Sequence, residues 1–194
     1  GHPVFRYWYM NKHYLPTTIN IAGIDCEIYS DYRDILEIFE IFNDPDLLES
    51  EKVIVALDFF YKTDDYKKDY ETATVEMMNF ITQCSDETPS NTSKKPLYDW
   101  EQDFNIIVAP INKAMNTDIR GLKYLHWWTF LSAFMEIGEC TFNTFVGIRD
   151  KLNKGIKLDK TEERIYKENR SKIVIKQKHD KVTQALMDEI LGRE

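Results

Sequence analysis

The chain has 194 residues and a mass of 23.0 kDa, a size that fits one ordinary domain or a domain with a helical appendage. Its 43% hydrophobic and 13% aromatic content can fill a core, and its seven glycines and six prolines exclude collagen-like or low-complexity sequence. The net charge of −8 conceals an asymmetry, because residues 1–150 carry 13 basic and 25 acidic side chains, whereas residues 151–181 carry 11 basic and 5 acidic ones. This asymmetry predicts either a basic arm that binds an acidic partner or a merely solvated helix.

Several global features indicate the cellular setting and the domain limits. Three widely spaced cysteines without a CxxC pair favour reduced thiols in a cytoplasm, and no apolar run approaches the ~20 residues that cross a bilayer. We therefore expect a soluble protein without membrane contact. The opening Gly-His is typical of a cleaved tag, so residues 1–9 are expected to be tag-derived or vector-derived. Residues 10–155 are predicted to form a helical domain and residues 156–194 a charged helical extension.

The first half of the chain predicts a hairpin followed by three helices. Residues 15–29 alternate between apolar and polar side chains around Ala22-Gly23, which is typical of a short β-hairpin. Helical periodicity follows in three stretches, with Ser30 or Asp31 as the first N-cap and Ser50 as the second, and the third stretch spans about residues 69–83. Residues 85–96 are polar and predict a surface loop.

The second half predicts the core. Residues 100–115 carry one clean apolar stripe, with Pro110 expected to kink the helix near Ile106. Residues 121–139 are apolar nearly all round, which predicts a buried central helix. A further helix from Thr141 to Gly155 follows, and then a long polar helix that begins at an Asp159 or Thr161 cap and runs to about Leu191. The fold class is therefore mainly α: a compact helical domain around a buried central helix, with a small N-terminal β-hairpin and a long C-terminal helix.

No pattern in the sequence predicts catalysis. The chain has no P-loop, no GxGxxG, no GxSxG and no HExxH, and its four histidines are far apart. His126 beside Trp127 and Trp128 could be drawn as a base in an aromatic pocket, but a hydrogen-bonded structural histidine is the commoner case. We expect a protein that is not an enzyme and needs neither cofactor nor metal. A small hydrolase centred on His126 is the least favoured of the alternatives.

The segment Tyr124-Leu125-His126-Trp127-Trp128-Thr129-Phe130 resembles a known family. Together with the preceding helix over 100–115 and the following Phe145-Val146-Gly147-Ile148-Arg149, it is similar to the gp-fifteen family of siphophages that infect Gram-positive bacteria. The resemblance covers roughly residues 15–170, and Pro110 departs from its pattern. Its weaker matches are Leu15-Pro16, Tyr32-Arg33, Asn43-Asp44-Pro45, Glu51-Lys52, Leu158-Asp159-Lys160 and Arg164-Ile165-Tyr166.

The resemblance implies a tail assembly chaperone, encoded ahead of the tape measure protein and acting in the host cytoplasm during virion assembly. Its expected partners are the tape measure protein, the major tail protein and further copies of itself through the C-terminal helix. The candidate partner-binding residues are Trp127, Trp128, Arg149, Arg164, Lys167 and Arg170. For the two tryptophans, packing in the core is favoured over an exposed anchor role, so the basic residues are the better candidates. A nucleic-acid-binding regulator that uses the basic arm is the alternative, and repulsion by the acidic body makes nucleic acid an unlikely partner.

Overall fold

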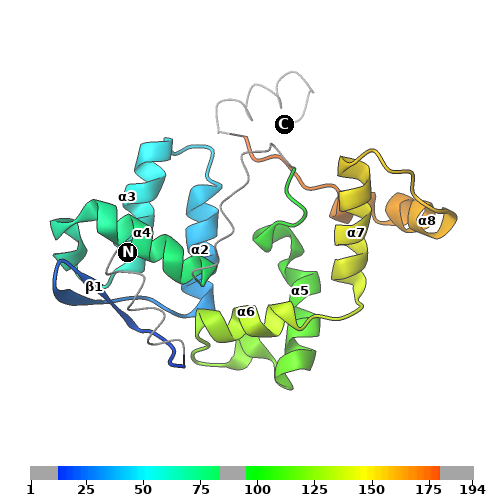
Figure 1. The fold of residues 1–194 in the computed structure, drawn as a ribbon. Coiled ribbons are helices and arrows are strands. Elements are labelled where there is room, and N and C mark those ends of the chain that lie inside the picture. The colour runs from blue at the N-terminus through cyan, green and yellow to red at the C-terminus, as the bar shows by residue number, and fades with distance from the viewer. Residues whose placement is uncertain (1–12, 84–94, 180–194) are drawn as a thin grey trace. The chain divides into compact units, whose positions relative to one another are not determined.

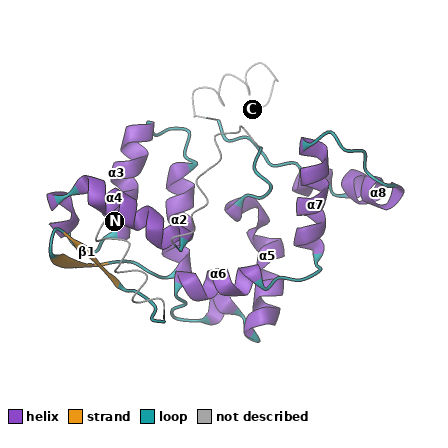
Figure 2. Cartoon of the chain, viewed as in Figure 1, coloured by secondary structure: helices purple, strands orange, loops and turns teal. Residues whose placement is uncertain are grey.

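The computed structural model describes residues 13–83 and 95–179, which are mainly helical (Figures 1 and 2). These residues form two compact units. Unit 1 comprises residues 13–83, His126–Trp128 and residues 178–179, and unit 2 comprises residues 95–125 and 129–177. The predicted mainly helical class with an N-terminal hairpin is confirmed. The domain limits placed at residues 9 and 155 stay predictions, and residues 1–9 lie outside the described residues.

Unit 1 begins with the predicted hairpin. Strands β1 (Thr18–Ile21) and β2 (Ile24–Glu27) pair antiparallel around Ala22 and Gly23. Both turn residues have positive φ, +51° and +86°, which is the backbone twist that a two-residue hairpin turn requires. Ile19 and Ile21 face inward and are at most 2% exposed, so the alternation in the sequence corresponds to the two faces of the hairpin.

Three α-helices complete most of unit 1. They are α2 (Tyr32–Phe42), α3 (Glu49–Phe60) and α4 (Tyr70–Thr82), with a short 3-10 turn, η1 (Asp64–Lys68), before α4. Asp31 caps α2 by accepting a hydrogen bond from the Arg33 amide, and Asp69 caps α4 in the same way. The predicted cap at Ser50 is wrong: α3 starts earlier, because the Glu51 carboxylate accepts the Leu48 amide and fixes the first turn there.

Unit 2 is built from the remaining helices, which are α5 (Trp100–Met115), η2 (Ile119–Gly121), α6 (Trp127–Met135), α7 (Thr141–Asn153), α8 (Lys160–Glu168) and α9 (Arg170–Ile173). Helix α6 begins in unit 1, since its first two residues are counted there. Helix α5 continues through Pro110, so proline does not end it, and the kink stays a prediction. Gly155 has a φ of +68° and follows the last turn of α7, as a C-terminal stop should.

The predicted central helix is shorter than its apolar sequence suggested. Helix α6 covers only nine residues; Met135 at its C-terminal end is 78% exposed, and Tyr124, three residues before its start, is 51% exposed. Residues 122–126 are not helical. The helix begins after His126 because the His126 imidazole accepts the Trp128 amide, as an N-cap does, while the Trp127 amide donates to the carbonyl of Ser30.

The long C-terminal helix is also interrupted. Helix α8 starts after Asp159, one of the two predicted caps: the Asp159 carboxylate accepts the Glu162 amide, and the Glu162 carboxylate accepts the Asp159 amide. The helix stops at Glu168, α9 adds only four residues, and residues 174–179 are not helical. A side chain from α7, Arg149, accounts for this end because it binds the last carbonyls of α9. Residues 180–191 of the predicted helix, like residues 84–94 of the predicted loop, lie outside the described residues.

Candidate functional site

The indole of Trp127 is fixed inside unit 1. The residue is 1% exposed, and its Nε1–H donates to the carbonyl of Ile81 at 2.9 Å. Its ring also packs against Phe39, with centroids 6.0 Å apart. Trp127 is therefore a core residue of unit 1.

Trp128, the next residue, also donates a hydrogen bond from its indole to a backbone carbonyl of α4. Its indole Nε1–H donates to the carbonyl of Phe80 at 2.8 Å, and its ring stacks on Phe80 at 5.7 Å. Phe80 and Ile81 belong to the last turn of α4, where backbone carbonyls lack helical donors. The Trp127 indole thus supplies a donor to the Ile81 carbonyl. The Trp128 indole adds a second donor to the Phe80 carbonyl, which also accepts the Gln83 amide at 3.3 Å, and Trp128 stays partly exposed.

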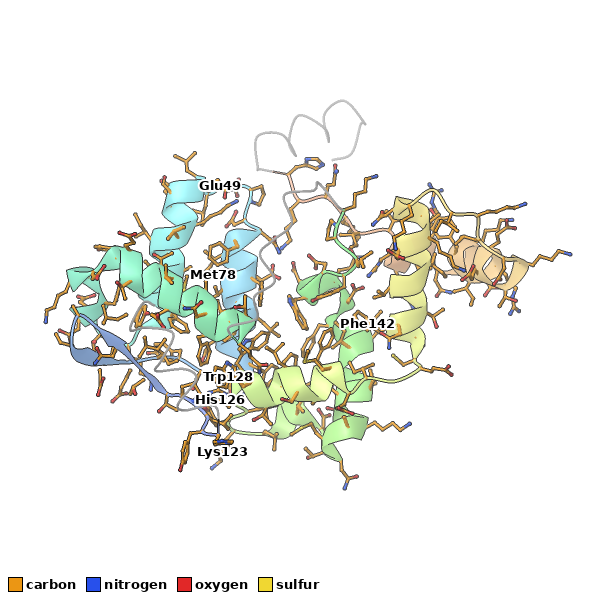
Figure 3. The ribbon with its side chains drawn as sticks, viewed as in Figure 1. Glu49, Met78, Lys123, His126, Trp128 and Phe142 are labelled. Atoms are coloured by element: carbon orange, nitrogen blue, oxygen red, sulfur yellow. The ribbon has the colours of Figure 1, made fainter. Side chains whose placement is uncertain are left out.

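His126 is a structural histidine that holds this segment in place (Figure 3). Its Nδ1 accepts the Trp128 amide at 3.0 Å, so the proton must lie on Nε2, which donates to the carbonyl of Pro16 at 2.9 Å. The side chain is buried, and burial lowers the pKa of the imidazole below 6.5, although the hydrogen bond to Pro16 opposes this shift. The neutral form is the one that caps α6.

This arrangement makes the stability of unit 1 sensitive to mild acid. The pKa of His126 is about 6.5 in the unfolded chain and lower in the folded chain. As the pH falls below about 6.5, the unfolded chain therefore binds a proton at His126 that the folded chain does not yet bind, and the free energy of unfolding decreases. The variant His126→Asn keeps an acceptor for the Trp128 amide and does not titrate. Urea denaturation between about pH 7.5 and pH 5 should show a steeper loss for the wild type than for His126→Asn. Parallel stability curves for the two proteins would show that His126 is not the sensor.

Arg149 is the most heavily bonded side chain of unit 2. It is 4% exposed, and it forms a two-pronged ion pair with Asp103 of α5 at 2.6 and 2.9 Å. Its other N–H groups donate to the carbonyls of Ile173, Lys172 and Leu97 at 2.6, 2.8 and 3.0 Å. All five guanidinium donors are therefore bound within unit 2, where they join α5, α7 and the end of α9.

Gln102 holds the chain that leaves α9. Its side-chain amide donates to the carbonyls of Lys172 and Val174, both at 3.0 Å, and its oxygen accepts the Lys176 amide at 3.0 Å. This pattern replaces the helical hydrogen bonds that residues 174–176 no longer make. Arg149 and Gln102 together thus fix the end of α9 and the residues that follow it.

Three of the predicted partner-binding residues are exposed. Arg164 and Lys167 lie three residues apart on α8, and Arg170 begins α9. In the described part of the chain no carboxylate is within salt-bridge distance of these three, whereas Lys151 pairs with Glu162. The binding roles of all six residues stay predictions, but the placement favours the three exposed cations over Trp127 and Arg149, whose polar groups bind inside their own units.

The sequence analysis missed the outer side of α3. Four of its apolar side chains, counting the preceding Leu48, are substantially exposed, and two acidic residues lie on the same side. We call this set the α3 face; its members are Leu48 (68% exposed), Ile54 (51%), Val55 (39%) and Phe59 (38%), with Glu51 and Asp58. The signal was present in the run Val53-Ile54-Val55-Ala56-Leu57, which holds more apolar residues than one buried stripe can use.

Helix α4 has a second exposed apolar set. Val75 is 50% and Met78 is 42% exposed, and both lie one to two turns from exposed Glu71 on the side away from the core. Tyr70, at the start of the helix, is 46% exposed. We call Tyr70, Val75 and Met78 the α4 face (Figure 3 labels Met78). Exposed apolar side chains in such groups mark surfaces that contact other proteins.

Unit 2 also contains an open hollow of about 790 Å³ between α5 and residues 136–141. Its walls include Ala109, Pro110, Gly138 and Cys140. No histidine lines it, so Cys140 has no imidazole base there. Among the residues that the structure describes, no three His, Cys, Asp or Glu side chains gather in a way that could hold a metal ion.

Comparisons with known proteins give a match to one protein family. No helix in residues 13–83 or 95–179 has the length and apolar character needed to span a bilayer. No curated protein and no solved structure matches the chain. The sequence profile of the family described as "Bacteriophage Gp15 protein" matches residues 12–175, a range that contains the indole pair, the Arg149–Asp103 pair and both exposed faces. The match confirms the resemblance seen in the sequence, and the chain belongs to the bacteriophage Gp15 protein family.

Proposed function

We propose that this protein is a tail assembly chaperone that binds the tape measure protein, keeps it in solution and brings major tail protein subunits to it. Membership in the family implies a structural or morphogenesis protein of a bacteriophage. A chaperone for a long helical client needs apolar side chains that remain available in the folded state, and it needs charge to keep the complex in solution.

The α4 face is the observation that carries the proposal. It presents exposed apolar side chains at helical spacing from unit 1, whose residues 13–83 carry 16 acidic and 5 basic side chains. An apolar stripe on an extended helical client can lie against Val75 and Met78 while the surrounding carboxylates keep the complex hydrated. Individual contacts of this size are weak, so many copies on one client would gain affinity from avidity.

Co-expression with the tape measure protein encoded by the same phage genome tests the proposal. We expect the client to move from the insoluble to the soluble fraction and to co-purify with this protein. The variant Val75→Lys/Met78→Lys should lose most of the co-purifying client, because it places two charges in the apolar contact. Both positions are exposed, so its own stability should change by less than about 1 kcal/mol.

A client that is equally insoluble with and without the wild-type protein would contradict the proposed function. A client that co-purifies equally with both proteins would leave the chaperone role standing and remove the α4 face as its binding site. Circular dichroism of the variant provides the folding control, because a lost helical signal would explain a lost complex without any binding role.

The nucleic-acid alternative has one observation in its favour, the exposed cations of α8 and α9. Phosphate binding needs such a surface. The net charge of −11 on residues 13–83 opposes it by repulsion. We therefore favour a protein partner for these cations as well.

A further inference from the structure

The α3 face and the exposed cations of unit 2 have complementary chemistry. The α3 face combines four exposed apolar side chains with Glu51 and Asp58 on a strongly acidic unit. Glu49, at the first turn of α3, adds a carboxylate whose side chain is 90% exposed while it pairs with Lys52 at 2.6 Å (Figure 3), and Asp58 pairs with Lys67 at 3.2 Å. A surface of this kind fits a partner that carries apolar side chains with Lys and Arg around them.

Unit 2 carries such a surface. Lys160, Arg164 and Lys167 are spaced four and three residues apart, which places them on one side of α8, and Arg170 follows at the start of α9. We call these four residues the basic arm. Ile156, in the loop before α8, is 51% exposed, and Leu152 at the end of α7 is 41% exposed. Residues 151–179 as a whole carry 10 basic and 4 acidic side chains.

We infer that the α3 face of one copy binds the basic arm, with Leu152 and Ile156, of a second copy. Leu152 and Ile156 would cover apolar side chains of the α3 face, and the arginines and lysines would approach Glu49, Glu51 and Asp58. The inference deepens the proposed function and rests on it in one respect, because an array of copies is what lines an extended client.

The contact joins two different surfaces, so it leaves one of each unused at the ends of a pair. Such a heterologous contact propagates and gives a ring or an open chain rather than a closed two-fold dimer. Exposed ion pairs contribute little individually, and salt weakens them. Assembly should therefore depend on protein concentration and decline as the salt concentration rises.

Two variants separate the two surfaces. The arm variant Arg164→Glu/Lys167→Glu/Arg170→Glu keeps the α3 face, and the face variant Ile54→Lys/Val55→Lys keeps the arm. All five positions are exposed, and lysine is a better helix former than valine or isoleucine. Removal of residues 156–194 would be a poor test, because Leu158 and Ile173 pack with Phe145 and Ile148 in a buried cluster of unit 2.

Light scattering at low salt and high micromolar concentration measures the outcome, without any client. We expect the wild type to form species larger than a dimer and each variant alone to be monomeric. An equimolar mixture of the two variants should give a dimer and nothing larger, because only one pair of intact surfaces remains. Circular dichroism verifies that both variants are folded.

Matched controls distinguish surface from net charge. The triple reversal Lys95→Glu/Lys113→Glu/Lys123→Glu makes the same charge change at exposed positions of unit 2 outside the arm, and Val75→Lys/Met78→Lys makes the same change as the face variant on α4. Both should assemble like the wild type. A monomeric wild type, a variant that assembles alone, a mixture without dimers or a control that dissociates would each overturn the inference. None of these results bears on whether the client binds.

Discussion

Replacing Arg149 by methionine is expected to lower the free energy of unfolding by about 3–5 kcal/mol. The change leaves Asp103 as a charged group at 1% exposure without its cation. It also removes the Arg149 donor from the carbonyls of Leu97 and Ile173 and one of the two donors of the Lys172 carbonyl. Methionine fills much of the same volume, so the loss comes mainly from the polar groups and not from a cavity. Urea denaturation followed by far-UV circular dichroism measures it.

Arg164→Met is the matched control, because the same residue type is changed on exposed α8. Its effect should stay within about 0.5 kcal/mol. The double variant Arg149→Met/Asp103→Leu should recover part of the loss, since it no longer buries an unpaired carboxylate. It should not recover all of it, because the carbonyls of Leu97 and Ile173 still lack the Arg149 donor and the Lys172 carbonyl keeps only Gln102. Equal destabilisation by Arg149→Met and Arg164→Met would contradict this role.

Replacing Trp127 by alanine should cost about 3–5 kcal/mol as well, through a large cavity and a lost hydrogen bond. The indole fills a fully buried site in unit 1 and supplies the donor for the carbonyl of Ile81. Trp127→Phe should cost less, because a ring remains in the site. Thermal unfolding provides the measurement.

Tyr124→Ala is the matched control for this change. Tyr124 lies three residues earlier in the same aromatic segment and is 51% exposed, so its loss should shift the free energy of unfolding by about 0.5 kcal/mol or less. If Trp127→Ala unfolds at the wild-type temperature, Trp127 is not a core residue and the description of the indole pair is wrong.

The sequence predicted the parts of the fold that local chemistry determines. The hairpin turn at Ala22-Gly23, the Asp159 cap and the stop at Gly155 were recognisable because turns and caps use residues whose conformational preferences are strong. Helix α5 was recognisable because its apolar stripe faces one side only.

The predicted helix boundaries were wrong where residues distant in the sequence determine the start or the end of a helix. The apolar run over residues 121–139 predicted one long helix, but His126 ends the helical pattern on its N-terminal side through bonds to Pro16 and Trp128. The polar run after Asp159 predicted continuous helix, but Arg149 binds the carbonyls at its break. No periodicity in the sequence reveals a partner more than twenty residues away.

The candidate site was only partly visible for the same reason. The sequence identified the cations Arg164, Lys167 and Arg170, because the charge of a side chain follows directly from its residue type. It does not reveal that the Arg149 guanidinium is bound by Asp103, which is 46 residues away, and by three backbone carbonyls. It also does not reveal the α3 face, because the type of an apolar residue does not indicate which side of its helix packs against the rest of the protein.

The central claim is that several copies of this protein bind one tape measure chain, and the mass of the co-purified complex tests it most directly. Size-exclusion chromatography with light scattering on the co-expressed pair should give one soluble species that contains both polypeptides, with this protein in excess over the client. A tape measure protein that elutes alone, a complex with one copy of this protein per client, or a purified fraction of this protein that contains no client would contradict the account.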